Sequence, residues 1–172
     1  MTDLNIIKNR KVKNDVFFTP QTVVDIHLKI VQPLVDENDI ILDPFYGQGA
    51  YYNSYSKYFN KNNKFDYTEI TLNKDFYDYN EKIDVIVSNP PFSQFNKVID
   101  HCIKLKPHTI SLIFGILNIS ARRMSVFNKA GYFIYSYHLV NVKGWFGNSI
   151  LITFTNKVKS NCISFDETLH KN

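Results

Sequence analysis

The sequence IDVIVSNPPF, at residues 83–92, joins an apolar, strand-like run to a stiff turn. The two prolines have fixed φ angles, and Asn89 and Pro90, which each precede a proline, are pushed towards extended conformations. We therefore expect a rigid ledge at the carboxyl end of a buried strand, where open α/β sheets bind their ligands. Asn89 Oδ1 and the Pro90 carbonyl can each accept one N–H, and Phe92 can stack on a ring. The turn can thus grip a flat molecule carrying an amino group, although a plain strand-ending turn is the alternative.

Two fixed acceptors suit methyl transfer to an exocyclic amine such as that of adenine. This amine is a poor nucleophile because its lone pair is delocalised into the ring. Acceptors on both of its hydrogens favour the pyramidal nitrogen of the transition state and stabilise the positive charge that develops there. A base inside a duplex cannot reach such a ledge, so the base has to be flipped out or already single-stranded.

A glycine-containing turn, DPFYGQGA at residues 43–50, follows another short apolar run. Gly47 and Gly49 let the backbone turn tightly and approach a ligand. The turn lacks both the Gly-Lys-Ser/Thr ending of a phosphate loop and the third glycine of the dinucleotide fingerprint. Asp43 in front of it fits a cationic amine better than a pyrophosphate. Glu69 lies 20 positions after Gly49, where an acid that binds a ribose diol is expected.

Taken in order, these motifs resemble class I S-adenosylmethionine-dependent methyltransferases, specifically the small phage and viral enzymes that methylate adenine N6 in DNA. The segment Phe17-Phe18-Thr19-Pro20 resembles the opening cofactor segment of that family, and Asp75-Phe76 resembles its adenine-contacting pair. The resemblance implies that S-adenosylmethionine is the cofactor, with its sulfonium near Phe17 or Phe18. It implies cofactor binding by Phe18, Thr19, Pro20, Asp43, Pro44, Phe45, Gly47, Gly49, Glu69, Asp75 and Phe76. It implies catalysis by Asn89, Pro90, Pro91 and Phe92.

The chain departs from the family pattern in two ways. Only five residues separate Glu69 from Asp75, too few for a crossover helix between parallel strands. We expect this stretch to run along the cofactor pocket without the usual helix. No segment is left for a target-recognition domain, so we expect broad or very short target recognition, or a partner subunit that supplies specificity.

The expected fold is α/β, a Rossmann-like sheet that is mostly parallel with an antiparallel carboxy-terminal strand pair. Helices are expected at 21–33, 48–60, 95–104 and 120–129. Strands are expected at 39–43, 65–70, 83–88, 109–115, 133–143 and 149–156. The domain prediction is a basic arm at 1–15, a single methyltransferase domain at 16–158 and a polar tail at 159–172.

Composition agrees with a small intracellular domain. The 172 residues carry a net charge of +4, and two distant cysteines, Cys102 and Cys162, give neither a disulfide framework nor metal-ligand spacing. The five histidines are scattered, so we predict no metal site. No stretch is long enough to span a membrane, and we expect a cytoplasmic protein. Heavy use of Asn, Lys, Ile, Tyr and Phe suggests an AT-rich viral or phage genome and an infected host cell.

DNA is the expected substrate. Basic residues can form a phosphate track, and two loop aromatics can wedge into a base step or stack on a flipped base. The residues proposed for nucleic-acid binding are Lys11, Lys13, Arg122, Arg123, Lys143, Trp145 and Phe146. The alternatives are a set of solvated charges and a hydrophobic lid or core. RNA bases, a protein glutamine amide, or a cofactor-binding subunit that needs a partner also fit the catalytic turn.

Overall fold

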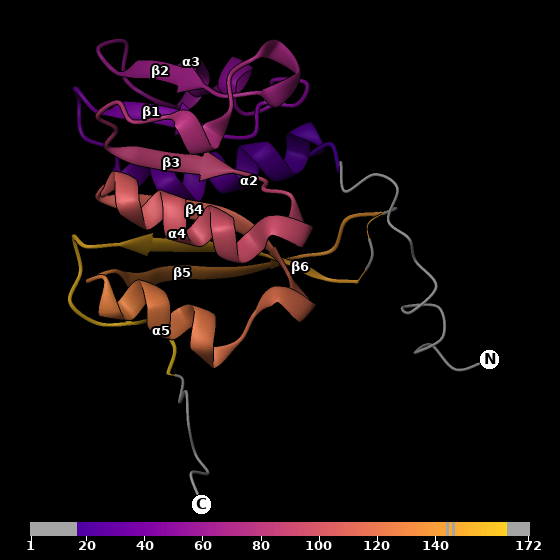
Figure 1. Cartoon of the computed structure of the whole chain (residues 1–172), viewed down its shortest axis with the longest axis vertical. Coiled ribbons are helices and arrows are strands. Elements are labelled where there is room, and N and C mark those ends of the chain that lie inside the picture. The colour runs from indigo at the N-terminus through magenta and orange to yellow at the C-terminus, as the bar shows by residue number, and fades with distance from the viewer. Residues whose placement is uncertain (1–16, 144, 146, 165–172) are drawn as a thin grey trace, which may run out of the picture.

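Six short strands form one sheet in the computed structural model, which describes residues 17–143, 145 and 147–164. The strand order is β2-β1-β3-β4-β6-β5 (Figure 1). The first four strands in this order are parallel, whereas β6 is antiparallel to both β4 and β5. The expected fold class is therefore confirmed. The strands are β1 Ile40–Asp43, β2 Lys64–Tyr67, β3 Val85–Ser88, β4 Thr109–Gly115, β5 Phe133–Val140 and β6 Ser149–Thr155.

Helices cover both faces of the sheet. In Figure 1, α4 and α5 lie in front of the sheet and α2 lies behind it. The helices are α2 Gln21–Val31, α3 Tyr55–Tyr58, α4 Phe95–Leu105 and α5 Ala121–Lys129. Short 3-10 turns cover Gln32–Leu34, Tyr52–Ser54, Ile70–Leu72, Phe76–Asp78, Phe92–Gln94 and Ile116–Asn118.

The strand β3 shows how the sequence divides the core between these two faces. Ile86 packs in the cluster that includes Val98 and Phe127 from α4 and α5. Val85 and Val87 join the other cluster, which contains the α2 side chains. Successive strand residues point to opposite faces, so an unbroken apolar run is what a strand buried on both faces requires.

The long helix expected at 48–60 is wrong. The structure has a 3-10 turn at Tyr52–Ser54 and then a single α-helical turn, α3. Gly49 has a φ of +78°, which delays the start of helical backbone. The tyrosines of this stretch instead pack inward, and Tyr51 and Tyr55 are 3% and 0% exposed.

The connection from β2 to β3 contains no α-helix, as the short spacing predicted. Strand β2 ends at Tyr67, earlier than expected, and Glu69 begins a 3-10 turn. A β-bridge between Glu69 and Lys74 closes this turn. The chain then continues through the 3-10 turn that starts at Phe76 and crosses to the amino end of the sheet, where the Asp84 N–H donates to the Ile40 carbonyl at 3.0 Å.

Candidate active site

The carboxyl ends of the adjacent parallel strands β1 and β3 meet where the sequence predicted a ligand. Asp43 ends β1 and Ser88 ends β3, and Ser88 Oγ donates a 2.6 Å hydrogen bond to Asp43 Oδ1. A cavity of about 410 Å³ opens at this edge. Its walls include the predicted residues Phe18, Pro44, Phe45, Gly47, Glu69, Asp75, Phe76, Asn89, Pro90 and Pro91.

The remaining predicted site residues lie around this cavity. Thr19 lines a smaller cavity of about 60 Å³ that shares Phe18, Gly47 and Asn89 with the larger one. Pro20 immediately precedes α2 and fixes where that helix begins. Asp43, Gly49 and Phe92 are not lining residues of either cavity. The structure therefore places most of the predicted cofactor residues on the cavity walls, and Asp43 and Gly49 outside those walls.

The glycine turn after β1 is held by hydrogen bonds from its backbone N–H groups to the two residues that follow β2. Gly47 and Gly49 have φ angles of +53° and +78°. The Gly47 N–H donates to Glu69 Oε2 at 2.9 Å, and the Tyr46 N–H donates to the Thr68 carbonyl at 3.1 Å. The predicted ribose acid thus also fastens the glycine turn.

Glu69 is held as a carboxylate by three donors. The Thr71 N–H and Oγ1 donate to Glu69 Oε1 at 3.1 and 2.8 Å, in addition to the Gly47 N–H on Oε2. Partial burial raises the pKa of Glu69, but these hydrogen bonds outweigh burial and lower it below its usual value. The role of Thr71 was missed from the sequence; a hydroxyl two positions after an acid is the signal that could have revealed it.

The predicted adenine pair lies on the cavity wall with its ring mostly in the core. Asp75 Oδ1 accepts a 2.9 Å hydrogen bond from the Tyr77 N–H. The Phe76 ring is 3% exposed and packs edge-on against Phe45 and His101, with centroids 5.3 and 4.6 Å apart. Phe76 therefore offers little free face, and most of its ring supports the pocket from behind.

Asp43 is the most perturbed acid of the site. It is 0% exposed, and its Oδ1 accepts hydrogen bonds from Ser88 Oγ and, at 3.3 Å, from the Phe45 N–H. Desolvation raises the pKa of Asp43 to about 7, and the negative charge of Glu69 adds to the rise. Its Oδ2 is buried and makes no hydrogen bond of ordinary geometry, although the nearby Tyr52 N–H has a small lowering effect on the pKa of Asp43. A buried acceptor of this kind is costly unless a ligand or water supplies a donor.

Asn89 has one satisfied end and one free end. Its Nδ2 donates to the Phe17 carbonyl at 2.9 Å and to Thr19 Oγ1 at 3.2 Å. Its Oδ1 is buried and has no hydrogen-bond partner. The oxygen predicted to accept an amine hydrogen is therefore the atom that the protein leaves unpaired.

Three aromatic rings gather beside Asn89. The Phe17 ring lies 6.3 Å from the Phe92 ring at an interplanar angle of 27°, and 6.2 Å from the Trp145 ring at 63°. Phe18 instead lies over Gly47. The two adjacent phenylalanines both line the two cavities, but their rings have different neighbours, which the sequence did not reveal.

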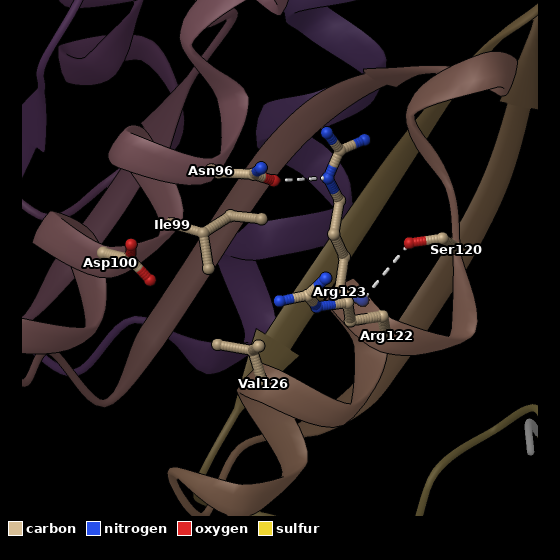
Figure 2. Close-up of a pocket in the computed structure, with 7 residues that line it drawn as sticks. All are labelled: Asn96, Ile99, Asp100, Ser120, Arg122, Arg123 and Val126. Carbon is tan, nitrogen blue, oxygen red and sulfur yellow. Dashed lines mark hydrogen bonds between the residues drawn. The ribbon is translucent and has the colours of Figure 1, made fainter. Parts of the chain in front are cut away.

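Arg122 and Arg123 border a separate cavity of about 470 Å³ between α4 and α5 (Figure 2). Arg123 Nε donates to Asn96 Oδ1 at 2.8 Å, and its Nη1 donates to the Asn118 carbonyl at 2.6 Å. Arg123 therefore holds the two segments together, whereas Arg122 is exposed. The exposed Lys143 and the half-buried Trp145 lie in the loop after β5. The predicted residues Lys11, Lys13 and Phe146 lie outside the described part of the chain.

The structure brings together three potential metal ligands that the sequence did not suggest. Asp36, Asp39 and His108 place their ligand atoms within 4.8 Å of one another. Asp39 and His108 precede β1 and β4, so the group lies at the opposite end of the sheet from the cavity. Lys157 Nζ donates to Asp36 Oδ2 at 2.7 Å, so a protein cation already neutralises part of the charge.

No protein-family model and no curated protein sequence matches the chain. Solved structures of similar fold include a candidate RNA methyltransferase, PH1948 from Pyrococcus horikoshii, with a TM-score of 0.67 and 16% identity over 86% of this chain and 90% of that chain. Magnesium protoporphyrin IX methyltransferase from Synechocystis, crystallised with S-adenosylmethionine, has a TM-score of 0.57 and 12% identity over 88% of this chain and 90% of that chain. The M protein of the type I restriction enzyme EcoKI has a TM-score of 0.59 and 12% identity over 88% of this chain and 46% of that chain. The chain therefore has the fold of class I S-adenosylmethionine-dependent methyltransferases.

Among the described residues, no helix combines the length and apolar character needed to cross a membrane.

Proposed function

We propose that this protein is an S-adenosylmethionine-dependent N-methyltransferase whose substrate is adenine N6 in DNA. The observation that carries the proposal is the pair of buried, unpartnered acceptors, Asp43 Oδ2 and Asn89 Oδ1, at the ends of two adjacent strands. One suits the ammonium of an amino acid and the other suits the amine of a substrate. The two acceptors therefore match the cationic and the nucleophilic partners of an N-methyl transfer.

The residues around the cavity fit S-adenosylmethionine from end to end. Its methionine end would lie near Thr19 and Asp43, its ribose would lie on Glu69, and its adenine would lie near Asp75. When bound, the cofactor would supply an electrophilic methyl group on a sulfonium, whose S–C bond breaks so that the neutral thioether leaves. Glu69 is partly exposed and its pKa is lowered, so it offers a carboxylate to a diol. Phe18 and Phe45 add aromatic surface, which attracts a cation.

At the reacting nitrogen, Asn89 orients the amine through its free Oδ1. The Pro90 carbonyl is the second acceptor in reach of the same turn, and the two prolines keep both acceptors fixed. As the new N–C bond forms, the nitrogen becomes positively charged and its hydrogens become better donors, so these acceptors stabilise the transition state more than the ground state. The nitrogen then loses one proton to solvent.

Two features support a nucleic-acid substrate over the alternatives. Aromatic rings cluster at the turn that would receive the base, and arginines lie on the same side of the sheet as α4. The structural neighbours include the M protein of a restriction enzyme and a candidate RNA methyltransferase. An RNA base, a protein glutamine amide, or a subunit that is silent without a partner remain the competing functions for the experiment to exclude.

The proposed function is tested by incubating the protein with methyl-labelled S-adenosylmethionine and, separately, duplex DNA, single-stranded DNA, RNA and protein. We expect label in DNA, on adenine N6. Label confined to RNA or protein would redirect the assignment of substrate. Absence of label in all four would favour the partner model.

Asn89→Ala is the matching test of chemistry. It should reduce turnover by about 10²–10³, the usual cost of losing one transition-state hydrogen bond, and it also removes the hydrogen bonds from Asn89 Nδ2 to Phe17 and Thr19, so cofactor affinity is measured beside turnover. Single-turnover rates and calorimetry separate the two effects. The control is Asn38→Ala, an identical change at an exposed residue before β1, at the other end of the sheet. Wild-type turnover in Asn89→Ala would rule out the proposed mechanism.

A further inference from the structure

The three aromatic rings beside Asn89 differ in how closely they are packed. The Phe92 ring packs against the Phe95 ring, with centroids 6.1 Å apart, and Phe95 is 1% exposed. A Cβ placed on Gly115 would lie 3.2 Å from Phe92 Cε2, so Phe92 is also supported closely by the β4 backbone. Phe17 is 36% exposed. One ring is therefore a fixed wall, and the ring above it has solvent on its far side.

The spacing of these two rings is close to that of a base sandwich. Stacked bases in DNA are about 3.4 Å apart, so a base stacked on both faces needs about 6.8 Å between its neighbours. The Phe17 and Phe92 centroids are 6.3 Å apart and the rings are tilted by 27°, so the gap between the ring planes is at most about this distance. The Phe17 side chain, which is 36% exposed, therefore has to move outward to admit a planar base.

The backbone of Phe17 is fastened to the same residue that would bind the base edge. Asn89 Nδ2 holds the Phe17 carbonyl at 2.9 Å, while Asn89 Oδ1 remains free and buried. A base whose amino group reached Oδ1 would therefore enter the region between Phe92 and Phe17. The Trp145 ring meets Phe17 edge-on at 6.2 Å and closes one side of this region.

We propose that Phe17 is the second stacking face for the substrate base, which lies between Phe17 and Phe92 with Trp145 at its edge. The sandwich takes a flipped or single-stranded nucleobase, as enzymes acting on bases outside the stack commonly do. This assignment rests on the proposed function, because it places the base of that reaction. It gives Phe17 a role on the substrate side, apart from Phe18 over the glycine turn.

The experiment uses the full chain and a single-stranded oligothymidine that carries one 2-aminopurine, whose fluorescence falls when the base stacks on an aromatic ring. A second oligonucleotide carries an abasic position in place of the 2-aminopurine. Wild-type protein should quench the fluorescence and bind the first oligonucleotide more tightly than the second. Phe17→Ala should weaken binding of the first by about 5- to 100-fold, the range for loss of one stacked base, and leave the second nearly unchanged.

Three further variants keep the result interpretable. Phe17→Trp should restore quenching because it keeps an aromatic face, whereas Phe17→Leu should not, although it keeps apolar volume. Tyr135→Ala is the matched control, since Tyr135 on β5 is 37% exposed, much like Phe17. Because Phe17 also lines both cavities, calorimetry with S-adenosylmethionine measures how much of the effect of Phe17→Ala lies on the cofactor side, and an unchanged urea unfolding midpoint would exclude a general collapse of the site.

Two outcomes would overturn the proposal. If Phe17→Ala bound the 2-aminopurine oligonucleotide more tightly than wild type, or had a higher kcat/KM, Phe17 would be blocking the base site instead of stacking on the base. Equal binding of both oligonucleotides by Phe17→Ala and wild type would mean that Phe17 does not contact the base. The proposed function fails separately: label transfer by wild type with no effect of Phe17→Ala refutes only the sandwich, whereas Phe17-dependent quenching without label transfer refutes only the reaction.

Discussion

At the scale of single residues, Asn89 is used at both ends of its amide. Its nitrogen fastens the segment that contains Phe17 and Thr19, and its oxygen is left for a ligand. Since an amide offers two donors and one acceptor group in a fixed plane, anchoring the nitrogen also aims the oxygen. The protein therefore positions its proposed catalytic acceptor by hydrogen bonds on the opposite side of the same group.

Glu69 illustrates a residue with both a structural and a binding role. Glu69→Ala should weaken S-adenosylmethionine binding by about 1.5–3 kcal/mol, the range for hydrogen bonds to charged groups. Part of this loss would come from the glycine turn, because Glu69 also accepts the Gly47 N–H. Isothermal calorimetry measures the change directly.

Thr71→Val tests how much the fixed position of the Glu69 carboxylate contributes to binding. It removes the 2.8 Å hydrogen bond from Thr71 Oγ1 but keeps the one from the Thr71 N–H. Binding should then weaken less than in Glu69→Ala, since the carboxylate and its hydrogen bonds from the Thr71 and Gly47 N–H groups stay in place. An affinity for S-adenosylmethionine that is the same in Glu69→Ala and wild type would remove Glu69 from the cofactor site.

Site residues were predictable from the sequence where they follow a strand-like run at a spacing typical of a known kind of site. Asn89 and Glu69 follow strand-like runs, and the structure places both on the cavity wall. The different neighbours of the Phe17 and Phe18 rings were not predictable from the sequence. Successive residues of an extended segment point in opposite directions, and only the tertiary contacts show which ring lies against which partner. Ser88 was likewise missed as the partner of Asp43, because the two are 45 positions apart.

At the scale of elements, the two glycines of the turn after β1 differ in what a side chain would meet. At both positions it would strain the backbone, but only at Gly49 would it also overlap with a neighbouring side chain. A Cβ on Gly49 would lie 2.6 Å from the Tyr46 ring, whereas one on Gly47 would meet nothing nearer than 3.9 Å. Tyr46 cannot easily swing away, because its ring packs against Tyr67 and Tyr52 with centroids 4.4 and 5.8 Å apart.

Gly49→Ala should therefore destabilise the protein more than Gly47→Ala. Both changes incur about 1–2 kcal/mol for a left-handed backbone conformation, and Gly49→Ala adds about 1–3 kcal/mol for overlap. Urea unfolding measures both free energies. Adding Tyr46→Ala to Gly49→Ala should recover part of the overlap cost, and equal stabilities of the two single variants would contradict this account.

Helices and strands with a clear hydrophobic periodicity were predictable from the sequence, whereas segments whose conformation depends on side-chain contacts were not. The expected strand at 109–115 matches β4, and the expected helix at 95–104 differs from α4 by one residue. The stretch at 48–60 has many aromatics but becomes mostly turns, because its tyrosines pack against partners distant in sequence, such as His27. The antiparallel carboxy-terminal pair was predicted, since two β-rich runs flank a glycine-containing loop.

At the scale of the whole molecule, two buried ionisable groups have opposite effects on how the free energy of unfolding depends on pH. His27 lies on α2 between Tyr51 Oη at 2.8 Å and Ser111 Oγ at 2.6 Å, and burial lowers its pKa to about 3. Burial raises the pKa of Asp43 to about 7. Below about pH 6.5, the unfolded chain binds a proton at His27 that the folded protein does not. Between about pH 7 and pH 4, the folded protein holds a proton at Asp43 that the unfolded chain has released.

These two linkages have opposite signs over the same range of pH. Acidification from pH 6.5 to pH 4 should decrease the free energy of unfolding through His27 and increase it through Asp43, each by about 1.4 kcal/mol per pH unit. Their sum is near zero, so neither group alone sets the acid stability of the wild-type protein. Removing Asp43 should expose the contribution of His27.

Asp43→Asn tests this balance, because asparagine keeps the shape of the side chain and cannot titrate. The difference in free energy of unfolding between wild type and Asp43→Asn should grow in favour of wild type as the pH falls from 6.5 to 4, since only wild type gains from the Asp43 proton. Urea unfolding at pH 4.5, 5.5 and 6.5 measures this difference, in which all other titrating groups cancel. Asp100→Asn, at an exposed position on α4, controls for the loss of one negative charge. A wild-type advantage that stays constant across this range would show that Asp43 is already ionised in the folded protein, and that a donor satisfies its Oδ2 in solution.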